Sequence, residues 1–165
     1  MEFMDFQSFR GRITSIENFL VDINEDNPGC YKLFSVEDGK GAIVNFVVMP
    51  RTYFVDHIML HTGDMVTGFY DANAAAPLIY PPRFRAIVMA KDSRNYSVKV
   101  SYFNEELISS DGALKLNITP STQLMLENGQ RFTGSPANRN LIVIYGSSTR
   151  SIPAQTTPYR IIVMC

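Results

Sequence analysis

Two stretches of the chain, 75 positions apart, carry the same pattern, and this repeat constrains the fold more than any other feature. Val66–Met89 aligns with Leu141–Met164 without a gap, so that Tyr70 matches Tyr145. The other matches are Phe84 with Tyr159, Arg85 with Arg160, Ile87 with Ile162, Val88 with Val163 and Met89 with Met164. A fixed internal period indicates one module used twice. We therefore expect two domains of similar plan, residues 1–92 and 93–165.

Length and composition are consistent with two small β domains. A chain of 165 residues suits two modules of about 80 residues each. An apolar fraction of 45% and a charged fraction of 19% are typical of a folded chain. Nine prolines and ten glycines favour short strands joined by tight turns. The linker 91–95 is short and polar, which predicts two domains packed as one rigid body.

The first domain has a recognisable order of predicted elements. Three strands come first, then a short amphipathic helix after Pro50 that is ended by Gly63, then two more strands. The predicted strands are Arg10–Ile16, Cys30–Val36, Ala42–Val48, Met65–Tyr70 and Phe84–Ala90. This order resembles the OB-fold, a five-stranded Greek-key barrel. The resemblance covers nearly all of residues 1–92 and implies a closed barrel with a helix between its third and fourth strands.

The second domain repeats this plan with changes. Tyr96–Tyr102 alternates apolar and polar residues, as a half-buried strand does. Pro120-Ser121-Thr122 matches Pro50-Arg51-Thr52, but a turn and a polar loop replace the helix. The predicted fold is therefore all-β, with two tandem OB-like barrels, the second having a hairpin or loop in place of the helix.

Charge and cysteine content argue against several classes of protein. Residues 1–92 hold eight Lys/Arg against twelve Asp/Glu, a net of −4, and residues 93–165 hold seven against four, a net of +3. Neither value matches the strong positive charge of a dedicated nucleic-acid binder. Cys30 and Cys165 make neither a disulfide framework nor a metal motif. No secretory signal or membrane-spanning segment is visible, which predicts a cytoplasmic protein with no membrane partner.

The segment before the last strand of the first domain is a candidate ligand surface. Tyr80, Arg83 and Arg85 flank two prolines and offer an aromatic and cationic surface for a base, a sugar or a phosphate. The structural alternative is a rigid loop that closes the barrel, with Tyr80 or Phe84 in the core. This structural alternative is favoured because the second copy of the repeat begins its last strand with a similar sequence, Pro158-Tyr159-Arg160. A feature kept in both copies indicates a constraint on the start of the strand.

OB barrels bind single strands through their second and third strands, which adds Phe46 as a candidate. Other candidates there are Tyr31, Lys32, Phe34 and Asn45. Acidic residues stand near these candidates in the sequence and are expected to repel phosphates. They are Glu17, Asp22, Glu25, Asp26, Glu37 and Asp38. In the second domain Arg131 and Arg139 lie in predicted loops, where they form an anion pocket only if those loops converge.

Enzymatic and metal-binding motifs are weak or missing. His57 and His61 are four residues apart, a spacing that places both on one helix face, but no third strong ligand is near in sequence. A solvated helix face is therefore preferred to a metal site, although the question stays open. Nucleophile-elbow, phosphate-loop and zinc-protease motifs do not occur. We expect a protein that is not an enzyme and uses no cofactor.

These observations predict a non-enzymatic binding or protein-interaction module. A protein partner or self-association is the favoured hypothesis, with Asp71–Pro82 and Thr133–Asn140 as contact loops. Binding of single-stranded nucleic acid or of a small anionic ligand is the alternative. The identity of the ligand and the oligomeric state stay open.

Overall fold

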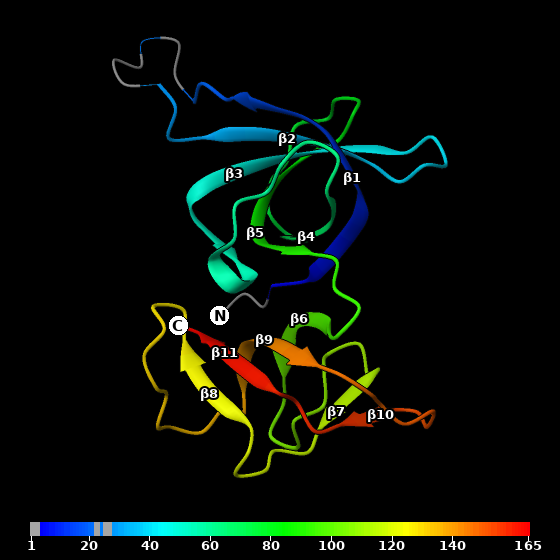
Figure 1. Ribbon diagram of the computed structural model, residues 1–165, viewed down its shortest axis with the longest axis vertical. Helices are drawn as coiled ribbons and strands as arrows, with labels where there is room; N and C mark the ends of the chain where they lie inside the picture. Colours follow the sequence, from blue (N-terminus) through cyan, green and yellow to red (C-terminus); the bar gives the residue numbers. More distant parts are fainter. Residues whose placement is uncertain (1–3, 22–23, 25–27) are drawn as a thin grey trace. The chain divides into compact units, whose positions relative to one another are not determined.

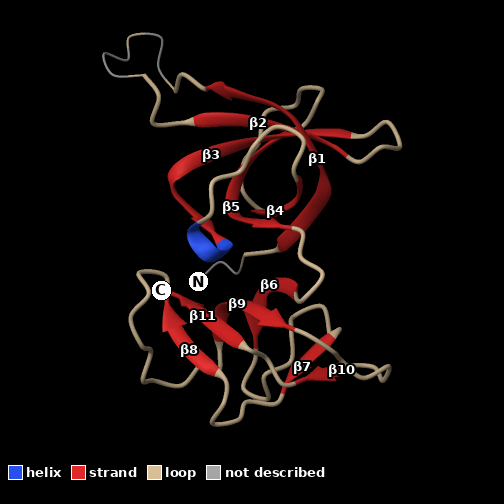
Figure 2. Cartoon of the chain, viewed as in Figure 1, coloured by secondary structure: helices blue, strands red, loops and turns tan. Residues whose placement is uncertain are grey.

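The computed structural model describes residues 4–21, 24 and 28–165, and the chain divides into two compact units, Met4–Asp92 and Ser93–Cys165. The regular structure of the described residues consists of strands and one short 3-10 turn (Figure 2). The protein is therefore all-β, as expected.

The first unit is a closed five-stranded barrel (Figure 1). Its strands follow one another around the barrel in the order β1-β2-β3-β5-β4, and β4 pairs with β1 to close it. All neighbours are antiparallel except β3 and β5, which are parallel. The strands are β1 (Phe6–Asn18), β2 (Lys32–Glu37), β3 (Ile43–Phe54), β4 (Met65–Asp71) and β5 (Arg83–Lys91). This order is compatible with an OB-like barrel.

The barrel interior is filled by alternate residues of each strand, because successive side chains of a strand point to opposite faces. Phe46 of β3 is fully buried and pairs directly with Phe34 of β2. Gly68 makes room for the Phe46 ring, since a Cβ atom there would lie 2.5 Å from the ring's Cζ. The Tyr70 ring stacks on Phe84 with centroids 4.0 Å apart.

The predicted helix between the third and fourth strands is wrong. Strand β3 continues through Pro50 to Phe54, and only the 3-10 turn η1 (Val55–His57) follows. Asp56 and His57 have φ angles of 64° and 51°, which a right-handed helix excludes. The apolar residues of this segment also share no buried face, since Val55 and Leu60 are buried whereas Ile58 and Met59 are exposed.

Pro50 lies where the pairing of β3 with β5 shifts register, between Val48 and Tyr53. Proline has no N–H to donate to a strand ladder, so such an irregular position suits it. The buried Thr52 hydroxyl bridges this region, because it accepts from the Met49 N–H at 2.9 Å and donates to the Ala86 carbonyl at 2.7 Å.

The second unit is an open arrangement and not a closed barrel. Residues 93–165 are all described, and they form a four-stranded sheet of order β6-β9-β11-β8 and a parallel pair, β10-β7. The expectation of a second closed barrel is therefore not met. The strands are β6 (Ser97–Phe103), β7 (Leu114–Leu116), β8 (Gln123–Leu126), β9 (Arg139–Tyr145), β10 (Ala154–Thr156) and β11 (Arg160–Met164).

Four strands of the second unit nevertheless repeat the arrangement of the first. The order β6-β9-β11-β8 corresponds to β1-β4-β5-β3, and in both sets only the last pair is parallel. Thr122 also repeats the contact of Thr52, since its hydroxyl accepts from the Thr119 N–H at 3.3 Å and donates to the Pro158 carbonyl at 2.9 Å.

Closure fails in the second unit because its connecting strands are short. In the barrel, β2 has six residues and pairs with both β1 and β3. In the second unit, β7 has three residues and pairs with β10. The last strand is also displaced by three residues, since Phe69 pairs with Val88 but the matched Ile144 pairs with Arg160 and not with Val163.

A hydrogen-bonded carboxylate organises the turn before β7. Burial favours the neutral acid of Asp111, but bonds from Lys99, from the Ser109 hydroxyl (2.6 Å) and from the Ala113 N–H (3.0 Å) outweigh it and lower its pKa to about 2. The carboxylate therefore stays ionised and holds the turn, Ser109–Ala113, in a shape that directs the chain into β7.

Candidate functional site

Strand alternation brings Arg83 and Arg85 to the outer face of the barrel. Between them, Phe84 packs against the barrel core, so the two arginines point the other way. In the parallel pairing of β5 with β3, Arg83 lies opposite Asn45 and Arg85 lies opposite Val47. Two guanidinium groups thus share one surface of β3 and β5.

Two aromatic residues meet where the loop between β1 and β2 begins and ends. The Phe19 N–H donates to the Tyr31 carbonyl at 2.9 Å, which extends the pairing of β1 with β2 by one residue pair. The Arg83 guanidinium lies over the Phe19 ring, 5.1 Å from its centroid. This cation–π contact restrains the arginine while leaving its planar edge able to donate hydrogen bonds.

These residues line one groove of about 630 Å³ on the barrel. Its floor includes Val47 and Met49 of β3, and Ala75 and Pro77 of the loop between β4 and β5 form part of its wall. None of the described residues that line it is Asp or Glu. We call it the arginine groove, defined by Phe19, Tyr31, Arg51, Arg83 and Arg85.

The structure brings together only some of the ligand residues predicted in the first unit. Arg83, Arg85 and Tyr31 line the arginine groove, and the predicted contact loop Asp71–Pro82 contributes to it. Tyr80 is 76% exposed and is not among the lining residues. Phe46, expected on the binding surface, is a core residue with no exposed area and cannot contact a ligand in this structure.

Phe19 and Arg51 were missed by sequence reasoning. Phe19 follows directly after the end of β1, and Arg51 stands in the Pro50-Arg51-Thr52 motif that both units carry as Pro-x-Thr. An aromatic residue at a strand end and a basic residue inside a repeated motif were the available signals.

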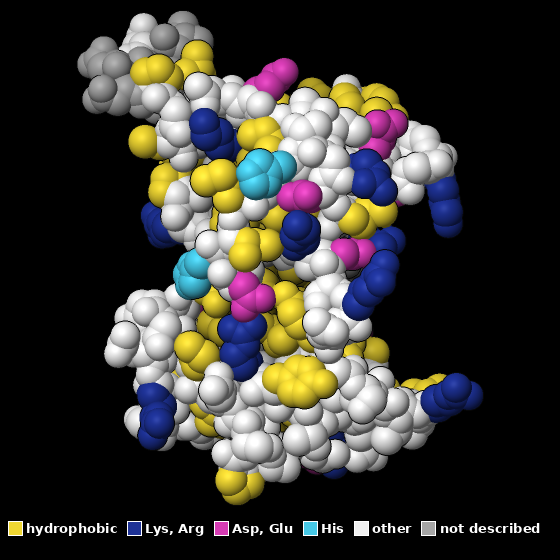
Figure 3. Space-filling model, in the orientation of Figure 1, with side chains coloured by type: hydrophobic (Ala, Val, Ile, Leu, Met, Phe, Trp, Pro, Cys, Tyr) yellow, Lys and Arg dark blue, Asp and Glu magenta, His cyan; other side chains and the backbone are white. Residues whose placement is uncertain are grey.

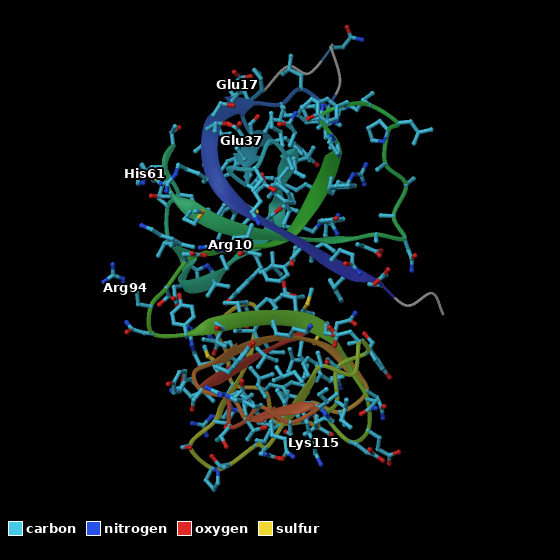
Figure 4. The ribbon with its side chains drawn as sticks, turned by 90° about the vertical axis from the view of Figure 1, so that its right-hand side faces the viewer. Arg10, Glu17, Glu37, His61, Arg94 and Lys115 are labelled. Atoms are coloured by element: carbon cyan, nitrogen blue, oxygen red, sulfur yellow. The ribbon has the colours of Figure 1, made fainter. Side chains whose placement is uncertain are left out.

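The acidic residues expected to repel phosphates do not line the arginine groove where the structure describes them. Glu17 and Glu37 belong to β1 and β2 and are labelled in Figure 4. Asp38 is occupied in its own turn, where it accepts from the Lys40 and Ala42 N–H groups. Asp22, Glu25 and Asp26 lie outside the described residues.

The arginines predicted in the second unit lie near one aromatic ring. The Arg139 guanidinium is 4.9 Å from the centroid of Phe132, and its Nε donates to the Ser135 carbonyl at 2.9 Å. Arg131 lines a shallow hollow beside Phe132 and β8, but Arg139 is not among the described residues that line it. Arg139 was predicted in a loop but is the first residue of β9. Arg131 and Arg139 do not line a common pocket among the described residues.

The two histidines do not share a helix face, because the helix is replaced by η1 and a loop. The His57 ring contacts Tyr53 edge-on at 5.3 Å, and His61 Nδ1 lies 3.9 Å from Asp64 (His61 is labelled in Figure 4). Asp64 also pairs with Lys91 at 3.7 Å. Within the described part of the chain, no three His, Cys, Asp or Glu residues are grouped as metal ligands.

Comparisons with protein-family models, with curated proteins and with solved structures give no match. The chemistry of the arginine groove is therefore what points to a function. On the face drawn in Figure 3, Lys and Arg side chains are scattered and form no large continuous patch. The described residues include no helix with the length and apolarity that a membrane crossing requires.

Proposed function

We propose that the protein is a non-enzymatic binding protein whose OB-like barrel binds single-stranded nucleic acid in the arginine groove. The observation that carries this proposal is the combination, in one groove, of three arginines with two aromatic residues and no carboxylate among the described lining residues. Guanidinium groups bind phosphate oxygens through paired hydrogen bonds. Aromatic side chains stack on bases, whatever the base.

The position of the groove supports the same function. It lies on β3 and β5 beside the loop that joins β1 to β2 and the loop that joins β4 to β5. OB barrels bind oligonucleotides and oligosaccharides on their second and third strands and through these two loops. The groove shares the third strand and both loops with that face, while β5 stands in place of β2 among the described lining residues. Of these two ligand classes, the arginines of the groove favour oligonucleotides, because a permanent positive charge pairs with a phosphate and not with a neutral sugar.

Size and charge limit the expected affinity. A volume of about 630 Å³ is within the range of small-molecule sites, so the groove accommodates one or two nucleotides. The net charge of −4 on residues 1–92 opposes the approach of a polyanion. We therefore expect binding in the micromolar range at low salt that weakens steeply as salt is added.

Fluorescence anisotropy with a labelled oligothymidylate tests the proposal. We expect binding at low ionic strength, with a negative slope of log affinity against log salt of about −2, as for three phosphate contacts to a single strand. Duplex DNA and inorganic polyphosphate serve as competitors. The absence of oligothymidylate binding at low salt would overturn the proposal, and equal competition by polyphosphate would reduce it to a site for anions.

A protein partner or a second copy of the chain is a second candidate, favoured by one exposed apolar segment. Leu78 is fully exposed, and Ile79 and Tyr80 beside it are 48% and 76% exposed. Exposed apolar residues in series are typical of interaction surfaces. Light scattering over a range of protein concentrations checks self-association: we expect a mass that rises with concentration if this segment pairs copies, whereas a constant monomer mass would contradict it.

A further inference from the structure

The second unit contains a separate hollow whose chemistry differs from that of the arginine groove. It has a volume of about 410 Å³ and lies between the end of β7, the loop after β9 and the residues just before β11. None of the described residues that line it is charged; they contribute hydroxyl groups, side-chain amides and one tyrosine ring. A site without charge favours a neutral ligand, because a buried unpaired ion is costly.

Tyr159 presents its ring to this hollow from a fixed backbone. Its N–H donates to the Ile144 carbonyl at 2.9 Å, and its carbonyl accepts from the Gln123 N–H at 3.0 Å. The residue is 55% exposed although its backbone is held on both sides. Gly146 allows the ring to lie close to the chain, since a Cβ atom there would be 2.3 Å from the Tyr159 hydroxyl oxygen.

Two side-chain amides line the same hollow as the ring. Asn117 Nδ2 donates to Gln155 Oε1 at 3.2 Å, and the Asn117 N–H donates to the Thr156 carbonyl at 2.8 Å. Each amide group has two donor hydrogens and an acceptor oxygen, so this single bond leaves both residues able to donate and Asn117 able to accept. A ligand that both donates and accepts, as a sugar hydroxyl does, suits this pair.

We propose that this hollow, the Tyr159 site, binds a neutral carbohydrate. The tyrosine ring offers an apolar face to the C–H side of a sugar ring, and Asn117 and Gln155 offer paired donors and acceptors to its hydroxyls. Concave sites with one aromatic surface and a few fixed polar groups are typical of small-ligand binding. The proposal is independent of nucleic-acid binding by the barrel.

Titration of the isotope-labelled full chain, followed by NMR amide shifts, tests the proposal. The probes are maltohexaose, cellohexaose, xylohexaose and chitohexaose at millimolar concentrations, with glycerol and triglycine as non-sugar probes. We expect at least one sugar to shift the amides of residues 146–149, 155–157 and 159. Failure of all four sugars to shift them, or equal shifts with glycerol or triglycine, would overturn the proposal.

Single substitutions test whether the sugar binds in the Tyr159 site, and distinguish a loss of binding from a failure to fold. Tyr159→Ala is expected to weaken sugar binding by about tenfold or more, and Asn117→Ala by about threefold. Gly146→Ala keeps the tyrosine but displaces its ring, so it is expected to weaken binding as well. Met59→Ala, which removes a side chain that is 78% exposed and lines neither hollow, is the control. Unchanged affinity in folded Asn117→Ala and Gly146→Ala would exclude this hollow even if Tyr159→Ala misfolds.

Discussion

Replacing Arg51, Arg83 and Arg85 together with glutamine is expected to weaken oligothymidylate binding by about a hundredfold or more. Each charge-assisted bond to a phosphate contributes about 1.5–3 kcal/mol, and all three side chains line the same groove. The slope of log affinity against log salt should fall towards zero, since the phosphate contacts that displace counterions are removed. Anisotropy titrations of the variant at several salt concentrations measure both effects.

The control for this variant removes the same charge elsewhere. Lys40, Arg94 and Arg150 are exposed and are not among the described residues that line the arginine groove. Their joint replacement with glutamine changes the net charge equally, so we expect a small loss of affinity through the general field alone. If both triple variants lose affinity to the same extent, binding depends on total charge and not on the arginine groove.

Replacing Phe46 with alanine is expected to lower the free energy of unfolding of the barrel by about 3–5 kcal/mol. The ring is fully buried among Phe34, Val66 and other core residues, and Gly68 opposite it has no side chain to fill the space. The variant would therefore contain a cavity. Chemical denaturation followed by circular dichroism measures the loss.

Phe19→Ala is the matched control, because it removes the same ring from the groove surface. We expect it to reduce oligothymidylate affinity by about tenfold through lost stacking while changing stability little. A Phe46 variant with unchanged stability and reduced binding would show that this ring acts at the surface, contrary to its burial.

The barrel was largely predictable because its strands are bounded by turn residues and alternate in polarity. Asp38, Gly39 and Gly41 mark the hairpin between β2 and β3, and the structure places a turn there. The helix prediction failed because apolar spacing over a few residues does not distinguish a helix from an irregular loop. Asp and His adopt the left-handed backbone seen at Asp56 and His57 more often than most residues do, but neither residue type requires it.

The second barrel was mispredicted because closure depends on pairing between distant residues. The repeat correctly indicates two strands that pair in both units, β4 with β5 and β9 with β11. It says nothing about β7, whose partner β10 lies about 40 residues further along the chain. The local pattern of Leu114–Leu116 is equally compatible with either pairing.

The candidate site was only partly predictable for a similar reason. Arg83 and Arg85 were found because they stand with Tyr80 around two prolines in one short motif. Phe19 and Arg51 reach the same groove from other parts of the chain, and one sequence does not show this proximity. The prediction that Phe46 lies on the binding surface was an avoidable error. Phe46 alternates with Val44 and Val48 along β3, and this spacing places all three on the core side of the strand.

Because Phe46 lies so close to Gly68, substitutions at these two positions, which are far apart in sequence, depend on each other. A descendant that acquires any side chain at residue 68 must first, or at the same time, shrink residue 46, because both occupy one volume. Drift at these two sites is therefore concerted, and among descendants of this chain a large residue at one should accompany glycine at the other.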